Sequence, residues 1–102
     1  MLGFHGRYDL LLTPTMPLTA FKVGLTGPED GSFGDDWINW SPYTCPFNLT
    51  QQPAASVPCG LARNGLPMGA QIVGPLRADA MVLRAARAVE RALAMPPPPS
   101  GV

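Results

Sequence analysis

The sequence has little charge, one histidine and one lysine. Charged side chains make up 14% of its 102 residues, and seven basic groups balance seven acidic ones. Without a basic excess, the chain lacks the electrostatic attraction that drives binding to phosphate backbones or to anionic lipid. We therefore expect neither nucleic acid nor a membrane as a partner.

Long apolar runs and paired cysteines are also missing. No apolar run approaches the roughly 20 residues of a membrane span, and residues 1–11 hold no apolar region of signal-peptide length. Cys45 and Cys59 lack the spacing of a zinc site or a redox pair. We therefore expect a cytoplasmic protein with two buried, reduced thiols, no metal and no cofactor.

A complete catalytic set is absent as well. Nucleophilic catalysis needs an activated side chain with a base beside it. His5 lies in a start that we expect to fray, and Ser56 stands between apolar strand residues, where a small side chain suits close packing. The chain has no Gly-x-Ser-x-Gly elbow and no phosphate-binding glycine loop. We therefore assign no catalytic residue and expect the chain alone to be inactive.

Proline and glycine, by contrast, are abundant, with 13 and 11 residues. Apart from the run at 96–99 they are spread along the chain, which indicates many turns between short elements rather than one linker. The final prolines favour an extended, polyproline-like conformation outside the fold. We therefore expect a folded part over residues 1–95 and a disordered tail over 96–102.

Three short strands are predicted. Residues 8–13 read "YDLLLT", whose consecutive leucines indicate burial on both faces, and Pro14 ends the run because proline has no backbone donor. The other two candidates are 55–57 and 68–73. The "RNG" at 63–65 is a turn signal, since Asn and Gly tolerate positive φ. We expect a central strand at 8–13 and an antiparallel hairpin downstream.

The last element is predicted to be an amphipathic helix. Asp79 stands at the N-cap position before "AMVLRAARAVERALA", and the arginines fall on a face that we expect to be solvated. The apolar stripe predicted to face the core consists of Val82, Leu83, Ala86, Val89 and Leu93.

The segment 24–41 is predicted to be a loop, because it is rich in Gly, Asp and Ser and has no period of 2 or 3.6. Loops of this length are usually lids or binding segments. Two tryptophans in its last five residues need a surface to cover: either they cap the local core or they line a pocket. The substrate-pocket candidates are Trp37, Trp40, Ser41 and Tyr43.

The spacing of small residues and prolines resembles the carboxyl-terminal part of the amidase signature family. The resemblance is carried by "YDLLLTPTMPLTAF" at 8–21, by "GLPMGAQIVG" at 65–74, and by Asn48, Pro53, Ser56, Pro58 and Gly60. It implies an α/β fold: a fragment of an α/β/α sandwich with a mixed sheet, here about three short strands plus a C-terminal amphipathic helix. The family's Ser–cis-Ser–Lys triad lies in an upstream segment that this sequence does not contain.

The resemblance implies a function for the longer protein. It would hydrolyse a carboxylic amide to an acid and ammonia or an amine, with this chain as sheet and pocket wall and the rest of the amidase domain as its partner. Cut out alone, the chain is expected to self-associate, through strand edges or through exchange of the 77–94 helix between copies. The alternative is an independent, non-catalytic interaction module that binds a partner through exposed apolar faces.

Two positions depart from the family pattern. Gln51 stands where the family often has glycine, so a backbone that needs positive φ there would be strained. Ser41 stands where members that act on glutaminyl-tRNA tend to carry aspartate. The second departure favours an amidase for small amides over a tRNA-dependent amidotransferase component.

Overall fold

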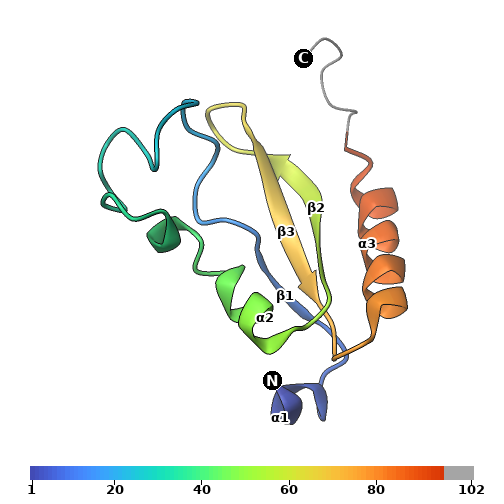
Figure 1. Cartoon of the computed structure of the whole chain (residues 1–102). Coiled ribbons are helices and arrows are strands. Elements are labelled where there is room, and N and C mark those ends of the chain that lie inside the picture. Colours follow the sequence, from blue (N-terminus) through green and yellow to red (C-terminus); the bar gives the residue numbers. More distant parts are fainter. Residues whose placement is uncertain (96–102) are drawn as a thin grey trace.

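The computed structural model describes residues 1–95, so the expected tail at 96–102 lies outside the described residues. Figure 1 shows a small sheet with helix α3 on one side and α2 with the long loop on the other. The elements in chain order are α1 (Leu2–His5), β1 (Leu11–Pro14), a 3₁₀ turn η1 (Trp37–Trp40), α2 (Cys45–Thr50), β2 (Ala54–Leu61), β3 (Pro67–Val73) and α3 (Asp79–Leu93).

The sheet has the order β1-β3-β2, and both strand pairs are antiparallel. This confirms the predicted α/β fragment of three short strands and a terminal helix, while the predicted mixed sheet is not seen among these three antiparallel strands. The predicted hairpin is also confirmed: Gly65 has φ +80°, and the Asn64 side chain accepts the backbone N–H of Leu66. Strand β2 extends past the predicted 55–57, with an irregular register between Pro58 and Gly60.

Strand β1 differs from its prediction in place and in burial. It begins at Leu11, and within this chain it is an edge strand because β3 occupies the centre. Pro14 still pairs with Ala70, and the backbone N–H of Thr15 donates to the Gly69 carbonyl. Leu12 is exposed, because α3 covers β2 and β3 but leaves this part of the sheet open.

The core lies between the sheet and α3. Val57, Ile72 and Ala86 form its buried cluster, with Ala85 and Val89 packed against it. Gly74 follows β3 at the point where the chain turns toward the helix, and a Cβ built there would lie 2.6 Å from Val82 Cγ2. The small residues therefore bring helix and sheet close together.

Helix α3 has the predicted extent but a different orientation. Ala78 is the N-cap, so Asp79 lies in the first turn and makes no side-chain cap hydrogen bond. Val82 and Ala86 are buried as predicted, but Leu83 and Leu93 are exposed. The predicted stripe was therefore wrong at these two leucines, because the close approach places Ala85 against the core instead.

A buried glutamine ties the first residues to the sheet, so the start is anchored rather than frayed. Gln52 donates to the Gly74 carbonyl at 3.0 Å and lies 2.7 Å from His5 Nε2. Because an amide nitrogen only donates, His5 Nε2 is the acceptor and the ring proton sits on Nδ1, which faces the Tyr8 carbonyl at 3.2 Å. The third partner, Thr50, donates to the Gln52 amide oxygen at 2.9 Å.

The cysteines are both free thiols. Cys45 is partly buried at the start of α2, but Cys59 is exposed on β2, so the expectation of two buried thiols was wrong for Cys59. The irregular register beside Pro58 explains this, since it interrupts the alternation that would bury the residue. Over residues 1–95, no helix is both long and apolar enough to cross a membrane.

The backbone at Gln51 has the left-handed conformation that the sequence pattern implied. Gln51 ends α2 with φ +56° and ψ +31°. Its N–H donates to the Asn48 carbonyl, and the next N–H, that of Gln52, donates to the Phe47 carbonyl. This is the conformation that a glycine adopts without steric cost at the end of a helix.

We expect Gln51→Gly to stabilise the fold. Removing Cβ relieves the left-handed strain, worth about 1–2 kcal/mol, against the glycine's greater freedom in the unfolded chain, so the net gain is about 0.5–1 kcal/mol. Urea unfolding followed by circular dichroism measures it. The matched control is Gln52→Gly, which removes the buried amide and should destabilise. A loss of stability in Gln51→Gly would contradict the strain.

Candidate functional site

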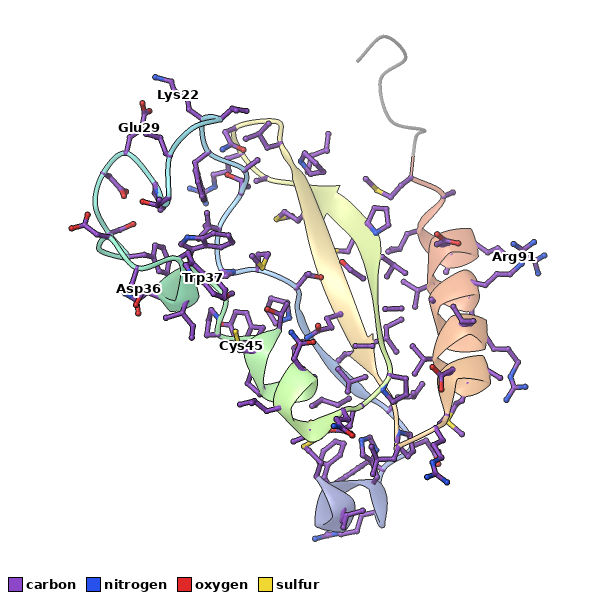
Figure 2. The ribbon with its side chains drawn as sticks, viewed as in Figure 1. Lys22, Glu29, Asp36, Trp37, Cys45 and Arg91 are labelled. Atoms are coloured by element: carbon purple, nitrogen blue, oxygen red, sulfur yellow. The ribbon has the colours of Figure 1, made fainter. Side chains whose placement is uncertain are left out.

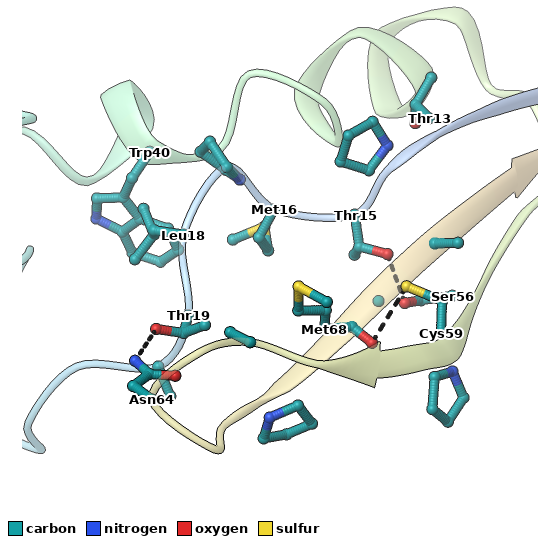
Figure 3. Close-up of a pocket in the computed structure, with 18 of the residues that line it drawn as sticks. Thr13, Thr15, Met16, Leu18, Thr19, Trp40, Ser56, Cys59, Asn64 and Met68 are labelled. Atoms are coloured by element: carbon teal, nitrogen blue, oxygen red, sulfur yellow. Dashed lines mark hydrogen bonds between the residues drawn. The ribbon is translucent and has the colours of Figure 1, made fainter. Parts of the chain in front are cut away.

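An open cavity of about 1260 Å³ lies over the strands and the segment that leaves β1. Because side chains alternate along a strand, Ser56 points away from the face on which Val57 packs against α3. Figure 3 shows the segment after Thr13 running along one side of the cavity and the β2–β3 hairpin along the other. The cavity is therefore bounded by chain segments from both halves of the sequence.

The exit segment after β1 supplies the cavity's apolar wall. Pro14 and Pro17 have no backbone donor and favour extended conformations in the residues before them, and the Thr15 N–H between them bonds to the Gly69 carbonyl of β3. Met16 and Leu18 line the cavity from this segment, and Met68 lines it from β3 (Figure 3). Flexible methionines adapt to ligands of different shape.

Trp40 lies at one end of this apolar wall. Its indole N–H donates to the Thr26 carbonyl at 2.7 Å, and its ring packs edge-on against Phe21 with centroids 5.4 Å apart. The hydrogen bond fastens the long loop to the tryptophan, and the ring lines the cavity. Of the two roles left open by the sequence, the structure places Trp40 at a pocket.

The floor of the cavity carries two hydroxyl groups in contact. Thr15 Oγ1 and Ser56 Oγ lie 2.6 Å apart, although β3 separates β2, which carries Ser56, from β1, which Thr15 follows. The contact is possible because the intervening residue on β3 is Gly69, where a Cβ would lie 2.8 Å from each hydroxyl oxygen. Gly69 is thus required for the close approach of the two side chains.

Gln71 fixes the segment that follows the loop. Its side-chain nitrogen donates to the Tyr43 carbonyl at 2.7 Å and to Thr13 Oγ1 at 3.0 Å. The side chain is buried, and both its N–H groups are used. The sheet therefore holds the chain before α2 in place, which in turn positions the loop that carries Trp40.

The four candidates from the sequence lie in different surroundings. Trp40 lines the cavity; Trp37, Ser41 and Tyr43 are not among its lining residues. Trp37 is exposed, and the buried Ser41 hydroxyl donates to the Ile38 carbonyl at 3.3 Å. Tyr43 contributes its carbonyl to Gln71. Their role toward a substrate stays a prediction.

Sequence reasoning missed Thr15 and Met16 as cavity residues. A signal was present: "PTMPLTAF" combines two prolines with alternating polar and apolar residues directly after a strand. Prolines at that spacing prevent a helix and favour an extended segment, in which consecutive residues can line a neighbouring cavity.

The cavity is almost uncharged. Among the described residues that line it, Arg63 alone carries a charge. Figure 2 shows Lys22 and Glu29 close together on the long loop, where Lys22 Nζ pairs with Glu29 at 2.7 Å, and Asp36 beside Trp37. Residues 1–95 hold no cluster of three potential metal ligands. The arrangement suits a neutral, largely apolar molecule.

The nucleophile candidates lack a base among the described residues. Ser56 contacts only the Thr15 hydroxyl, and Cys59 donates weakly to the Met68 carbonyl at 3.6 Å. His5 is bonded to Gln52 and Lys22 to Glu29. The cavity can therefore bind a molecule but does not by itself activate a nucleophile.

Comparison with known protein families and solved structures gives consistent matches. The family model described as Amidase matches residues 1–83. A bacterial aryl acylamidase of the amidase signature family superposes with a TM-score of 0.70 at 36% identity, over 90% of this chain and 20% of that one. A 6-aminohexanoate cyclic dimer hydrolase has a TM-score of 0.71 at 30% identity, over 92% and 21%.

Curated relatives of the chain are named as amidotransferase subunits rather than as amidases. A glutamyl-tRNA(Gln) amidotransferase subunit from Halothermothrix orenii is 43% identical over 89 residues, which are 86% of this chain and 17% of the relative. The corresponding protein from Brevibacillus brevis is 46% identical over 84 residues, which are 82% and 16%. The chain thus spans about a sixth of the length of the curated relatives that it matches.

Proposed function

The chain belongs to the amidase family, and from that premise we propose that it forms the carboxyl-terminal part of an enzyme that hydrolyses a carboxylic amide. The products would be an acid and ammonia or an amine. The observation that carries this proposal is the family match over residues 1–83, supported by the superposition with the aryl acylamidase. The catalytic serine and its relay would come from the remainder of the domain.

The role we propose for this chain is to form one wall of the substrate pocket. The cavity is larger than the roughly 300–1000 Å³ of typical ligand pockets, and it is open. Such a concave half-site fits a pocket whose other wall belongs to a further part of the protein. Exposed side chains such as Leu2 and Leu49, each 84% exposed, provide apolar surface for that contact.

The substrate we propose is a small, neutral amide. The support is the apolar lining, in which Arg63 is the only charged side chain among the described residues that line the cavity. Glutamine, by contrast, carries an ammonium and a carboxylate, and a cavity without an acidic side chain offers the ammonium no partner. A second candidate is the activity named for the curated relatives, which their 43–46% identity favours.

The remaining expectations are part of this proposal. We propose no nucleic acid or membrane partner and a cytoplasmic location, in keeping with the balanced charge. We also propose that the chain self-associates when isolated, because β1 and β2 end the sheet with unpaired edges.

Expression of the complete open reading frame that contains this chain tests the function. We expect release of ammonia or amine from simple aryl and alkyl amides, and no release by the 102-residue chain alone, because it lacks a nucleophile with a base. Glutamine is the matched second substrate. Turnover of glutamine alone would favour the amidotransferase activity. A reading frame that starts at Met1 and shows no hydrolysis would favour the independent interaction module.

A further inference from the structure

The hydroxyl pair on the cavity floor has hydrogen-bonding capacity that the fold does not use. Thr15 Oγ1 and Ser56 Oγ share one hydrogen bond at 2.6 Å, which consumes one of their two protons. Within residues 1–95, neither hydroxyl has a further side-chain hydrogen bond. One proton and several lone pairs therefore face the open cavity.

The surroundings make this pair distinctive within the cavity. Met16 and Met68 lie beside it, as Figure 3 shows, while two other hydroxyl groups of the cavity accept hydrogen bonds from neighbouring side chains. Thr13 Oγ1 accepts from Gln71, and Thr19 Oγ1 accepts from Asn64 at 3.0 Å. Each of these two hydroxyl groups keeps its own proton, but among the described residues that line the cavity only the Thr15–Ser56 pair places a free proton and free lone pairs on two oxygens in contact with each other.

We propose that the Thr15–Ser56 pair is the specificity-determining contact of the cavity and binds a neutral carboxamide attached to an apolar body. The free hydroxyl proton donates to the carbonyl oxygen, and a hydroxyl lone pair accepts the amide N–H. Two adjoining groups, one donor and one acceptor, match the two edges of a carboxamide. The lack of a Cβ at Gly69 lets the two hydroxyl groups lie side by side.

The inference rests on the proposed function only for the choice of an amide as ligand. A purely structural role is the competing explanation, because the pair also joins the exit of β1 to β2 across β3. If the pair is only a structural tie, its removal would lower stability and weaken the binding of every ligand alike. If the pair recognises the ligand, its removal would change the preference between an amide and a hydrocarbon of the same shape.

Two probes separate these roles. Benzamide and α-methylstyrene share the same planar heavy-atom skeleton, but only benzamide carries the carbonyl oxygen and the amide N–H. Binding of each to the 102-residue chain is followed by NMR chemical-shift titration, without catalysis. The variants are Thr15→Val and Ser56→Ala. The matched control is Thr19→Val, whose hydroxyl lines the cavity but is already bonded to Asn64.

We expect both variants to weaken benzamide binding by about two- to tenfold, the value of one hydrogen bond, and to change α-methylstyrene binding by less than about twofold. Thr15→Ser, which keeps the hydroxyl, and Thr19→Val should retain the preference for benzamide. If Thr15→Val loses its fold, Ser56→Ala removes a single oxygen from an exposed residue and carries the same test.

Equal losses for both probes would overturn the proposal, and so would an absence of saturable benzamide binding by the unmodified chain. Loss of preference in Thr19→Val would also contradict it. These outcomes are independent of turnover by the complete protein: an enzyme that hydrolyses amides with an unchanged preference in the variants refutes this inference alone.

Discussion

A Val82→Asp variant is expected to be largely unfolded at about 25 °C, whereas Leu83→Asp should keep its fold. Val82 is 2% exposed on the helix face against the sheet, and Leu83 is 65% exposed. A carboxylate at position 82 would be buried without a partner, which costs several kcal/mol, about 4 or more once the lost apolar contact is included. Because small domains are only marginally stable, this loss is a large share of the total free energy of unfolding.

The comparison is informative because the two residues are neighbours in one helix and receive the same new side chain. Leu83→Asp should change the free energy of unfolding by no more than about 0.5 kcal/mol. Far-UV circular dichroism and urea unfolding at low protein concentration measure both. Similar losses at the two positions would mean that α3 presents a different face to the sheet.

Gly74→Ala is expected to have the second largest effect, a loss of about 1–3 kcal/mol. The new Cβ would lie 2.6 Å from Val82 Cγ2, and a buried, β-branched valine has no alternative rotamer into which it can move freely. Helix and sheet must therefore separate, or the glycine's backbone must shift and strain its N–H bond to the Pro53 carbonyl.

The control for this variant is Gly3→Ala, because no atom lies within 4 Å of a Cβ built at Gly3, in α1. There alanine should be neutral or slightly stabilising, since it reduces the freedom of the unfolded chain. The thermal midpoints of the two variants, measured under the same conditions, test whether the new Cβ at Gly74 is destabilising. A Gly74→Ala midpoint equal to that of Gly3→Ala would show that the close contact is not needed.

Features set by neighbouring residues could be predicted from the sequence. The turn at Asn64 and Gly65 and the two strands that it joins depend on contacts a few residues apart. The left-handed backbone at Gln51 was implied by the family pattern and is present. Helix α3 likewise shows its extent in its own periodicity.

Features set by distant contacts could not be predicted. The rotation of α3 depends on Gly74, which admits the helix so close to the sheet that Ala85 rather than Leu83 faces the core. A helical wheel gives the direction of the apolar face only to within about one residue's rotation. Large leucines shift the predicted face toward their own positions.

The candidate site was predictable in part for the same reason. Trp40 was noticed because a tryptophan in a polar loop needs a surface to cover, and it lines the cavity. Thr15 and Ser56 carry no such local signal. They are 41 residues apart, and they meet only because Gly69 on the strand between them has no side chain.

The central position of β3 has a consequence for the order in which the chain folds. Its partner β2 is joined to it by a short turn, and α3 follows directly, so residues 54–93 can assemble through contacts close in sequence. Strand β1 must instead close the long connection over residues 15–53 before Leu11 can pair with Val73. Because loop closure opposes such pairing until the contacts form, we expect the hairpin and helix to fold first and β1 to dock last. The cavity, whose wall leaves β1, would then be completed only in the final step of folding.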